Sequence, residues 1–131
     1  MAKVTLREIS YKTFGKCVEL SNGMVKLIIT IDIGPRIINY SFIDGENIMF
    51  EDVNKTISQS GEQFDKFGGG AWNINGGHRF WTSPEAMPRS YYPDNEPVHY
   101  EEIETGIRLI PAPQKWTHYA MEMEVRLSPD S

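Results

Sequence analysis

Met24-Val-Lys-Leu-Ile-Ile-Thr-Ile-Asp-Ile33 is the stretch that decides the fold class of this 131-residue chain. Every second residue from Val25 to Ile33 is apolar, whereas the residues between them are mixed. A period of two is typical of a β-strand, because successive side chains of a strand point to opposite faces of a sheet. The stretch therefore predicts a strand with one well buried face and one mixed face.

Turn signals on both sides of this stretch extend the prediction to antiparallel hairpins. Ser21-Asn22-Gly23 precedes it, and Asn-Gly is the strongest short hairpin signal, so we expect pairing with an extended segment at residues 15–20. Alternation resumes over residues 36–42, and Asp44-Gly45 predicts a second hairpin turn into residues 47–50. The first half therefore reads as a run of short antiparallel strands.

The second half begins with a long irregular segment. Residues 51–97 are rich in Gly and Pro, and a segment of this length without regular structure is usually functional or mobile. A short helix within residues 51–67 stays open, although no apolar period of 3.6 supports it. Strands return at residues 98–105, 107–112 and 116–127. The chain is therefore predicted to be one all-β domain, an antiparallel β-sandwich over residues 1–131.

The last predicted strand bears on association. Residues 116–127 are followed by Ser128-Pro-Asp-Ser131, which looks like the start of a turn, and no returning strand follows. An unpaired strand edge is a template for pairing with another chain. We expect either a homo-oligomer that uses this edge or a fragment whose missing C-terminal half completes the sheet. The alternative is a strand that pairs on one side only.

Charge and cysteine content exclude several partners. The formal net charge is -5, the pI is near 5.2, and Lys and Arg are scattered, so no basic patch for nucleic acid is expected. Cys17 is the single cysteine, which fits a reducing cytosol. The N-terminus lacks the apolar run of a signal peptide, and no apolar stretch is long enough to span a bilayer. We therefore expect a cytoplasmic protein without a membrane partner.

The densest set of polar and aromatic residues lies in Asn73-Ile-Asn-Gly-Gly-His-Arg-Phe-Trp81, followed by Thr82-Ser-Pro-Glu85. A histidine such as His78 can shuttle a proton near neutral pH, and Arg79 offers fixed donors for hydroxyl, carboxylate or phosphate oxygens. Neighbours in an extended segment point to opposite sides, so His78 and Arg79 are not expected to face one ligand together. The structural alternative is that Arg79 pairs with Glu85 and that His78 caps a loop.

Aromatic residues flank this segment and suggest a sugar as ligand. The C–H faces of a sugar ring stack on aromatic rings, and its hydroxyls meet polar groups at the rim; the flanking rings are Trp72, Trp81, Tyr91 and Tyr92. The alternative is burial in a core, which aromatic residues often serve. Trp116 is predicted to lie in the core or on a sheet surface. Asp94 and Asn95 are interpreted as turn residues after Pro93.

Other chemistries find little support. His99 and His118 lie on separate predicted strands without a third ligand, so no metal site is predicted. The glycine run at residues 68–70 lacks the spacing of a nucleotide loop, and no cofactor is expected. Cys17 sits in a strand pattern without an activating neighbour and is predicted to be a buried thiol.

Several of these stretches together resemble the galactose mutarotase-like superfamily, in an aldose 1-epimerase-like branch. They are the opening strands with Asp44-Gly45-Glu46-Asn47, then Gly76-Gly-His-Arg-Phe-Trp81, Pro84-Glu85 and Tyr92-Pro-Asp-Asn-Glu-Pro-Val98. The resemblance covers nearly the whole chain, but only about the N-terminal half of the family's fold, a large antiparallel β-supersandwich. It implies carbohydrate binding in a cleft on the concave face of one sheet.

The resemblance also implies roles for residues. In mutarotases a histidine acts as general acid and a glutamate as general base, while a further histidine and an arginine bind the sugar. His78 is similar to that binding histidine, although the order of Gly and His differs, and Arg79 is the candidate binding arginine. The family's acid and base would lie beyond Ser131, so the catalytic residues stay unknown.

The resulting prediction is a carbohydrate-binding portion of an aldose 1-epimerase-like protein that interconverts sugar anomers in its full-length parent. His78 and Arg79 would orient hydroxyls, Trp81 would stack on the ring, and Glu85 would hold Arg79. The alternatives are a non-catalytic carbohydrate-binding module and a β-rich assembly domain.

Overall fold

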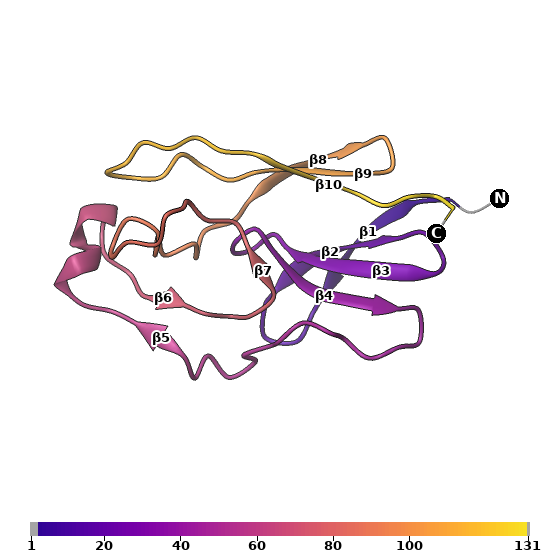
Figure 1. Cartoon of the computed structure of the whole chain (residues 1–131), viewed down its shortest axis with the longest axis horizontal. Coiled ribbons are helices and arrows are strands. Elements are labelled where there is room, and N and C mark those ends of the chain that lie inside the picture. The colour runs from indigo at the N-terminus through magenta and orange to yellow at the C-terminus, as the bar shows by residue number, and fades with distance from the viewer. Residues whose placement is uncertain (1–2, 131) are drawn as a thin grey trace.

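The computed structural model describes residues 3–130, which form an all-β fold of antiparallel sheets (Figure 1). A five-stranded sheet has the order β1 (Thr5–Ser10), β2 (Lys16–Ser21), β3 (Val25–Thr30), β4 (Arg36–Phe42) and β7 (His78–Arg79). A three-stranded sheet has the order β10 (Met123–Arg126), β9 (Gly106–Ile110) and β8 (His99–Ile103). The predicted all-β fold class is confirmed.

The two larger sheets pack face to face as a sandwich, with β8 to β10 forming the layer above β1 to β4 in Figure 1. The core between them takes Leu27, Ile29 and Ile31 from the predicted buried face of the central stretch. These residues meet Ile107 and Leu109 of β9. Burying each such side chain contributes about 1.5–3 kcal/mol, so this apolar layer is the main stabilising feature of the sandwich.

The other face of this stretch is mixed, as predicted: Ile28 and Thr30 are buried, whereas Met24 and Asp32 are exposed. Ile28 packs there with Cys17 of β2, Ile38 of β4 and Phe14 from the loop before β2. Burial raises the pKa of the Cys17 thiol to about 12, and the nearby Asp32 carboxylate adds to this effect. The prediction of a buried thiol at Cys17 is confirmed.

The predicted hairpin at Ser21-Asn22-Gly23 is confirmed. Strands β2 and β3 pair with Leu20 opposite Leu27. In the turn between them, the Asn22 side-chain oxygen accepts hydrogen bonds from the backbone N–H groups of Met24 and Val25, both at 2.9 Å. Strand β4 has the predicted bounds. The first strand, β1, was not predicted.

Residues 47–50 do not form the predicted strand. Their backbone makes a single hydrogen bond to β4, from Ile48 N to Tyr40 O at 3.1 Å. The Asn47 side chain occupies the edge of β4 instead. It accepts from the Tyr40 backbone N–H and donates to the Ile38 carbonyl, both at 2.9 Å. The prediction was wrong because a side-chain amide satisfies groups that a strand backbone would have paired.

The last strand is much shorter than predicted. Only β10 is regular within residues 116–127, because the backbone of Trp116 and His118 adopts φ values of 69° and 60°. Such left-handed positions break strand alternation. β10 pairs with β9 on one side and is an edge strand. Pairing of this edge with a second copy stays a prediction.

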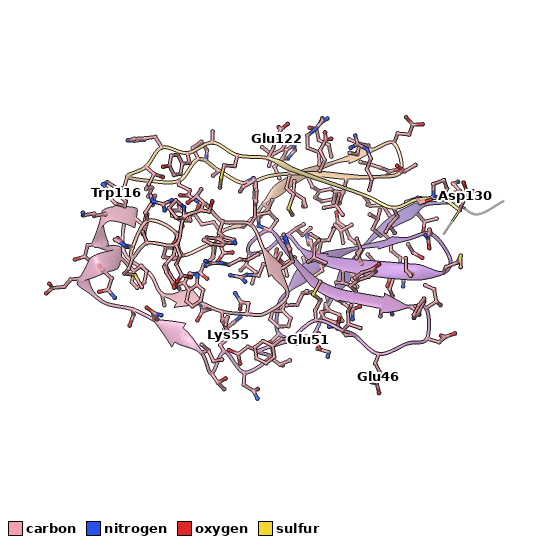
Figure 2. All side chains as sticks on the ribbon, in the orientation of Figure 1. Glu46, Glu51, Lys55, Trp116, Glu122 and Asp130 are labelled. Carbon is pink, nitrogen blue, oxygen red and sulfur yellow. The ribbon has the colours of Figure 1, made fainter. Side chains whose placement is uncertain are left out.

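The segment predicted to be irregular contains short regular elements and its own small core. The elements are β5 (Ser58–Gln59), the 3₁₀-helix η1 (Glu62–Phe67), β6 (Trp72–Asn73) and β7. Phe64, Phe67 and Trp72 form a buried aromatic cluster. Trp116, predicted to lie in the core or on a sheet surface, lies in a turn instead. It is 41% exposed and packs edge-on against Phe67 with the ring centroids 5.6 Å apart. Figure 2 places it at the end of the molecule opposite Asp130.

Within residues 3–130, no helix has the length and apolar character that crossing a bilayer requires.

Candidate functional site

Two glycines bring the motif around His78 and Arg79 against the large sheet. Gly76 and Gly77 have φ values of 113° and 65°, which side chains disfavour. A Cβ atom would lie 2.0 Å from the Phe50 carbonyl oxygen at Gly76, and 2.0 Å from the Ile37 carbonyl oxygen at Gly77. Only glycine allows this close approach, and it lets β7 pair with the start of β4, placing Arg79 opposite Arg36.

Arg36 is a buried cation that holds the loop before β7. Its side chain is 1% exposed. One terminal nitrogen donates to the carbonyl oxygens of Ile74 at 2.7 Å and Gly76 at 3.2 Å. The other donates to the carbonyl of Asn73 and to Oδ1 of Asp94, both at 3.2 Å. Arg36 therefore fastens residues 73–76 and Asp94 to the first residue of β4.

Asp94 is the carboxylate partner of Arg36 and is not the turn residue that the sequence suggested. No turn forms at residues 92–95. Instead, the Asp94 carbonyl accepts a hydrogen bond from the Gly34 backbone N–H at 2.8 Å, which brings its side chain beside Arg36. Burial raises the pKa of the Asp94 carboxyl, whereas the Arg36 guanidinium opposes this rise. The pair is the polar centre of the site.

Arg79 lies among three aromatic rings. Its guanidinium carbon is 5.2 Å from the ring centroid of Trp72, 4.9 Å from that of Trp81 and 5.3 Å from that of Tyr91. Cation–π attraction of this kind contributes about 0.5–2 kcal/mol. Burial lowers the pKa of Arg79, and the positive charge of Arg36 lowers it further. The group stays charged, because an arginine side chain does not deprotonate in proteins.

Glu85 does not hold Arg79 in the way that was expected. Across the described part of the chain, residues 3–130, the Arg79 guanidinium has no ion pair and donates no hydrogen bond. Glu85 is exposed and lies near Tyr91. Burial raises the pKa of the Tyr91 hydroxyl, and the Glu85 carboxylate raises it further. The Glu85 carboxylate therefore interacts with the Tyr91 hydroxyl and forms no ion pair with Arg79.

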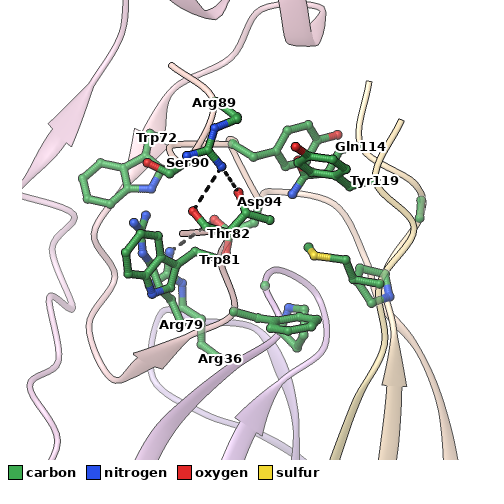
Figure 3. A pocket seen from close by; sticks show the side chains of 17 residues that line it. Arg36, Trp72, Arg79, Trp81, Thr82, Arg89, Ser90, Asp94, Gln114 and Tyr119 are labelled. Carbon is green, nitrogen blue, oxygen red and sulfur yellow. Dashed lines mark hydrogen bonds and ion pairs between the residues drawn. The ribbon is translucent and has the colours of Figure 1, made fainter. Parts of the chain in front are cut away.

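Two adjoining hollows surround these residues. The inner hollow, of about 40 Å³, has Arg36, Arg79, Trp72 and Trp81 on one side and Gln114 and Tyr119 on the other (Figure 3). Arg89 closes it by donating to the Thr82 hydroxyl at 2.8 Å. Since one water needs about 10–15 Å³, the inner hollow has room for a few waters at most and is too small for a sugar ring.

The outer hollow is large enough for a small ligand. It has a volume of about 310 Å³, at the lower end of the range for small-molecule sites. Its lining combines aromatic rings, glycine backbone and charged side chains: Arg36, Phe50, Trp72, Ile74, Gly76, Gly77, Arg79, Glu85 and Tyr91. Arg36, Trp72 and Arg79 line both hollows, so they form the wall between them.

The structure separates the four predicted binding residues. Arg79 and Glu85 line the outer hollow, and Trp81 lines the inner hollow against Arg79. His78 is exposed and lines neither of the two. Strand alternation explains this outcome, because His78 and Arg79 are neighbours in β7 and point to opposite sides.

The sequence did not identify Arg36, Asp94 or Phe50 as part of the site. The sequence did contain an indication for Arg36. It is the only charged residue of the predicted strand at residues 36–42, and a charge that becomes buried needs a partner. The partner itself could not be inferred, since Asp94 lies 58 residues further along the chain. Phe50 gave no signal, because it was assigned to a strand that does not form.

The two histidines outside the site segment lie apart from both hollows. His99 and His118 are both exposed. In the part of the chain that the structure describes, residues 3–130, no three His, Cys, Asp or Glu side chains gather closely enough to hold a metal ion.

No protein-family model, no curated protein and no solved structure matches this chain. The resemblance to mutarotases therefore stays a prediction.

Proposed function

We propose that the chain binds a carbohydrate in the outer hollow, as the sugar-binding portion of a mutarotase-like protein. The observation that carries the proposal is the lining of this hollow. Phe50, Trp72 and Tyr91 offer aromatic surface, and Arg79 offers N–H donors that no carboxylate in residues 3–130 pairs with. The Glu85 carboxylate, which also interacts with Tyr91, offers an acceptor. Sites with apolar walls and a few placed polar groups are typical for small ligands.

Binding is better supported than catalysis. Mutarotation needs a general acid and a general base, both within hydrogen-bond reach of the sugar. Among the described residues, the outer hollow presents one carboxylate, Glu85, and no histidine. A non-catalytic carbohydrate-binding module remains the alternative, and it differs from the first reading only in the absence of ring opening. Polarimetry on freshly dissolved glucose or galactose separates the two.

The test of sugar binding uses a matched pair of exposed phenylalanines. Phe50 is 57% exposed and lines the outer hollow, whereas Phe42 is 74% exposed on β4 and lines neither hollow. We expect Phe50→Ala to weaken binding of a hexose about five-fold, since a stacked ring contributes about 1 kcal/mol. Phe42→Ala should leave the affinity unchanged in calorimetry. Equal affinities of the two variants, or no response to any of a panel of hexoses, would refute the proposal.

Assembly through strand edges is the second candidate function. It is favoured by β1 and β10, each of which pairs with a neighbouring strand on one side only. Exposed edges of this kind can accept a strand from another copy. A concentration-dependent sedimentation coefficient would support assembly, and a monomeric mass from micromolar to millimolar concentration would exclude it.

A further inference from the structure

We infer that the sugar bound in the outer hollow is an acidic one, whose carboxylate or phosphate group binds the guanidinium of Arg79. The inference rests on the proposed function and deepens it, because it names the chemical class of the ligand.

The first observation is that Arg79 differs from the other arginines. The sequence contains six, and all lie within residues 3–130. Five donate side-chain hydrogen bonds to protein oxygens: Arg7, Arg36, Arg89, Arg108 and Arg126. Among these described residues, only the Arg79 guanidinium makes no such bond. Its aromatic neighbours attract the cation through their rings, and within residues 3–130 the Tyr91 hydroxyl accepts no hydrogen bond from it.

The second observation is the charge around Arg79. Over the two hollows, three guanidinium groups meet two carboxylates: Arg36, Arg79 and Arg89 against Asp94 and Glu85. Asp94 pairs with Arg36, and Glu85 forms no ion pair with any of the three within residues 3–130. The Nε atom of Arg36 is buried and has no hydrogen-bond partner within residues 3–130. A local excess of positive charge thus exists in a chain whose formal net charge is -5. A bound anion would offset it.

The chemistry of the guanidinium decides between an anion and a neutral hydroxyl. Removing a charged group from water is costly unless an opposite charge or hydrogen bonds replace the water. A carboxylate or phosphate accepts two parallel N–H groups from one arginine, and such charge-assisted bonds are about twice as strong as neutral ones. A hydroxyl supplies one acceptor and no charge. Arg79 therefore favours an anionic sugar over its neutral parent.

The experiment uses calorimetry at constant ionic strength to compare the affinities of the whole chain for related sugars. The probes are glucose, glucuronate, glucose 6-phosphate and inorganic phosphate. We expect at least one acidic sugar to bind ten-fold or more tightly than glucose. A preference for glucuronate identifies a carboxylate ligand, and a preference for glucose 6-phosphate identifies a phosphate ligand. Either result supports the inference.

Substitutions of Arg79 and the salt dependence of binding test whether the preference for an acidic sugar arises at this residue. Arg79→Gln should abolish the preference for the acidic sugar, and Arg79→Lys should retain part of it, because a lysine keeps the charge but loses the two-pronged geometry. The control is Arg126→Gln on the exposed edge strand, which should bind as the parent does. Should Arg79→Gln not fold, raising NaCl from 50 to 500 mM must weaken the acidic sugar at least three-fold more than glucose.

The outcomes separate this inference from the proposed function. Glucose and the acidic sugars binding equally well would overturn the inference and leave carbohydrate binding intact. Inorganic phosphate binding as tightly as glucose 6-phosphate, without any response to glucuronate, would overturn the acidic sugar as ligand. No response to any probe would overturn both the inference and the proposed function.

Discussion

The sandwich and the region that lines the hollows are held together in different ways. Between the two sheets, Leu27, Ile29 and Leu109 contact one another through apolar surface alone. Around the hollows, residues 73–76 and Asp94 depend on the hydrogen bonds of one buried cation, Arg36. The comparison shows that the scaffold has many interchangeable contacts, whereas the site has a few specific ones.

Arg36 belongs to both regions, and this makes the comparison testable. Its backbone lies in β4, and its backbone N–H donates to the Thr30 hydroxyl at 3.0 Å. Its side chain reaches into the loop that carries β7. Variants at Arg36 and its surroundings should therefore disturb the site strongly, while equivalent changes on the sandwich surface should not.

The largest effect is expected from Arg36→Met. The change leaves the Asp94 carboxylate and several carbonyls buried without donors, and breaking a buried ion pair in this way costs about 3–5 kcal/mol. Urea unfolding followed by circular dichroism measures the loss. The control is Arg7→Met, where an arginine 70% exposed pairs with Glu19 across β1 and β2. That surface pair should contribute less than about 1 kcal/mol. Similar losses in both variants would contradict the distinction between the two regions.

The next effect concerns the close approach of the site loop to β4. Gly77→Ala places a Cβ atom 2.0 Å from the Ile37 carbonyl, which must force β7 away from β4. We expect a loss of about 2–3 kcal/mol in the free energy of unfolding, from strain and displaced backbone. Gly69→Ala is the matched control, because Gly69 also has a positive φ, 88°, but open space around its Cβ position. Its cost should stay near 1 kcal/mol.

A smaller effect is expected from pH. Glu124 of β10 has a pKa lowered by hydrogen bonds from Arg108 and Arg126, and two further carboxylates with a lowered pKa lie in the irregular region. The Thr56 hydroxyl and the backbone N–H groups of Ile57 and Thr56 lower the pKa of Asp52. Burial would raise the pKa of Glu51, but hydrogen bonds led by that from Lys12 lower it on balance. The unfolded chain therefore binds more protons at mildly acidic pH, and the stability is complete above the ordinary values of 4.5 and 3.8.

That stability should be lost as pH falls through the lower folded pKa values. Asp94 partly offsets the trend, because its pKa is raised and its contribution has the opposite sign. Asp52→Asn should flatten the decline of unfolding free energy between pH 6 and pH 3, whereas the exposed Glu46→Gln should not. An unchanged slope in Asp52→Asn would show that the acid sensitivity comes from elsewhere in the fold.

The smallest effect belongs to the sandwich. Cys17 is fully buried, and its pKa near 12 keeps it protonated at neutral pH. The thiolate is the reactive form, so a disulfide reagent at pH 8 should modify Cys17 only in the unfolded chain. If the reagent modified Cys17 as fast in the native chain as in urea, the sandwich would open readily and its apolar contacts would not keep it closed.

Sequence reasoning succeeded where structure depends on local pattern. The hairpin at Asn22-Gly23 and the strand at residues 36–42 follow from turn chemistry and alternation, which act within a few residues. It failed at residues 47–50 because one asparagine side chain took the place of a strand. It also failed at residues 116–122, where the alternation is present but the backbone turns at Trp116 and His118.

For the site, the sequence singled out Arg79 and Glu85, which line the outer hollow, and Trp81, which lines the inner one, but it did not predict how they contact one another. The expected ion pair between Arg79 and Glu85 is not formed, and three aromatic rings surround the arginine instead. Spacing along a chain sets which residues are near one another. It does not set which groups turn toward each other once the chain is packed.

The order of apolar and polar residues, read along the chain, was sufficient to determine an all-β protein with short antiparallel hairpins, because a pleated strand records its two faces residue by residue. Only the tertiary structure decided that Arg36 meets Asp94, that His78 turns outward and that Arg79 pairs with no carboxylate of residues 3–130. These outcomes depend on how a sheet and a distant loop pack together, and no local pattern carries that information.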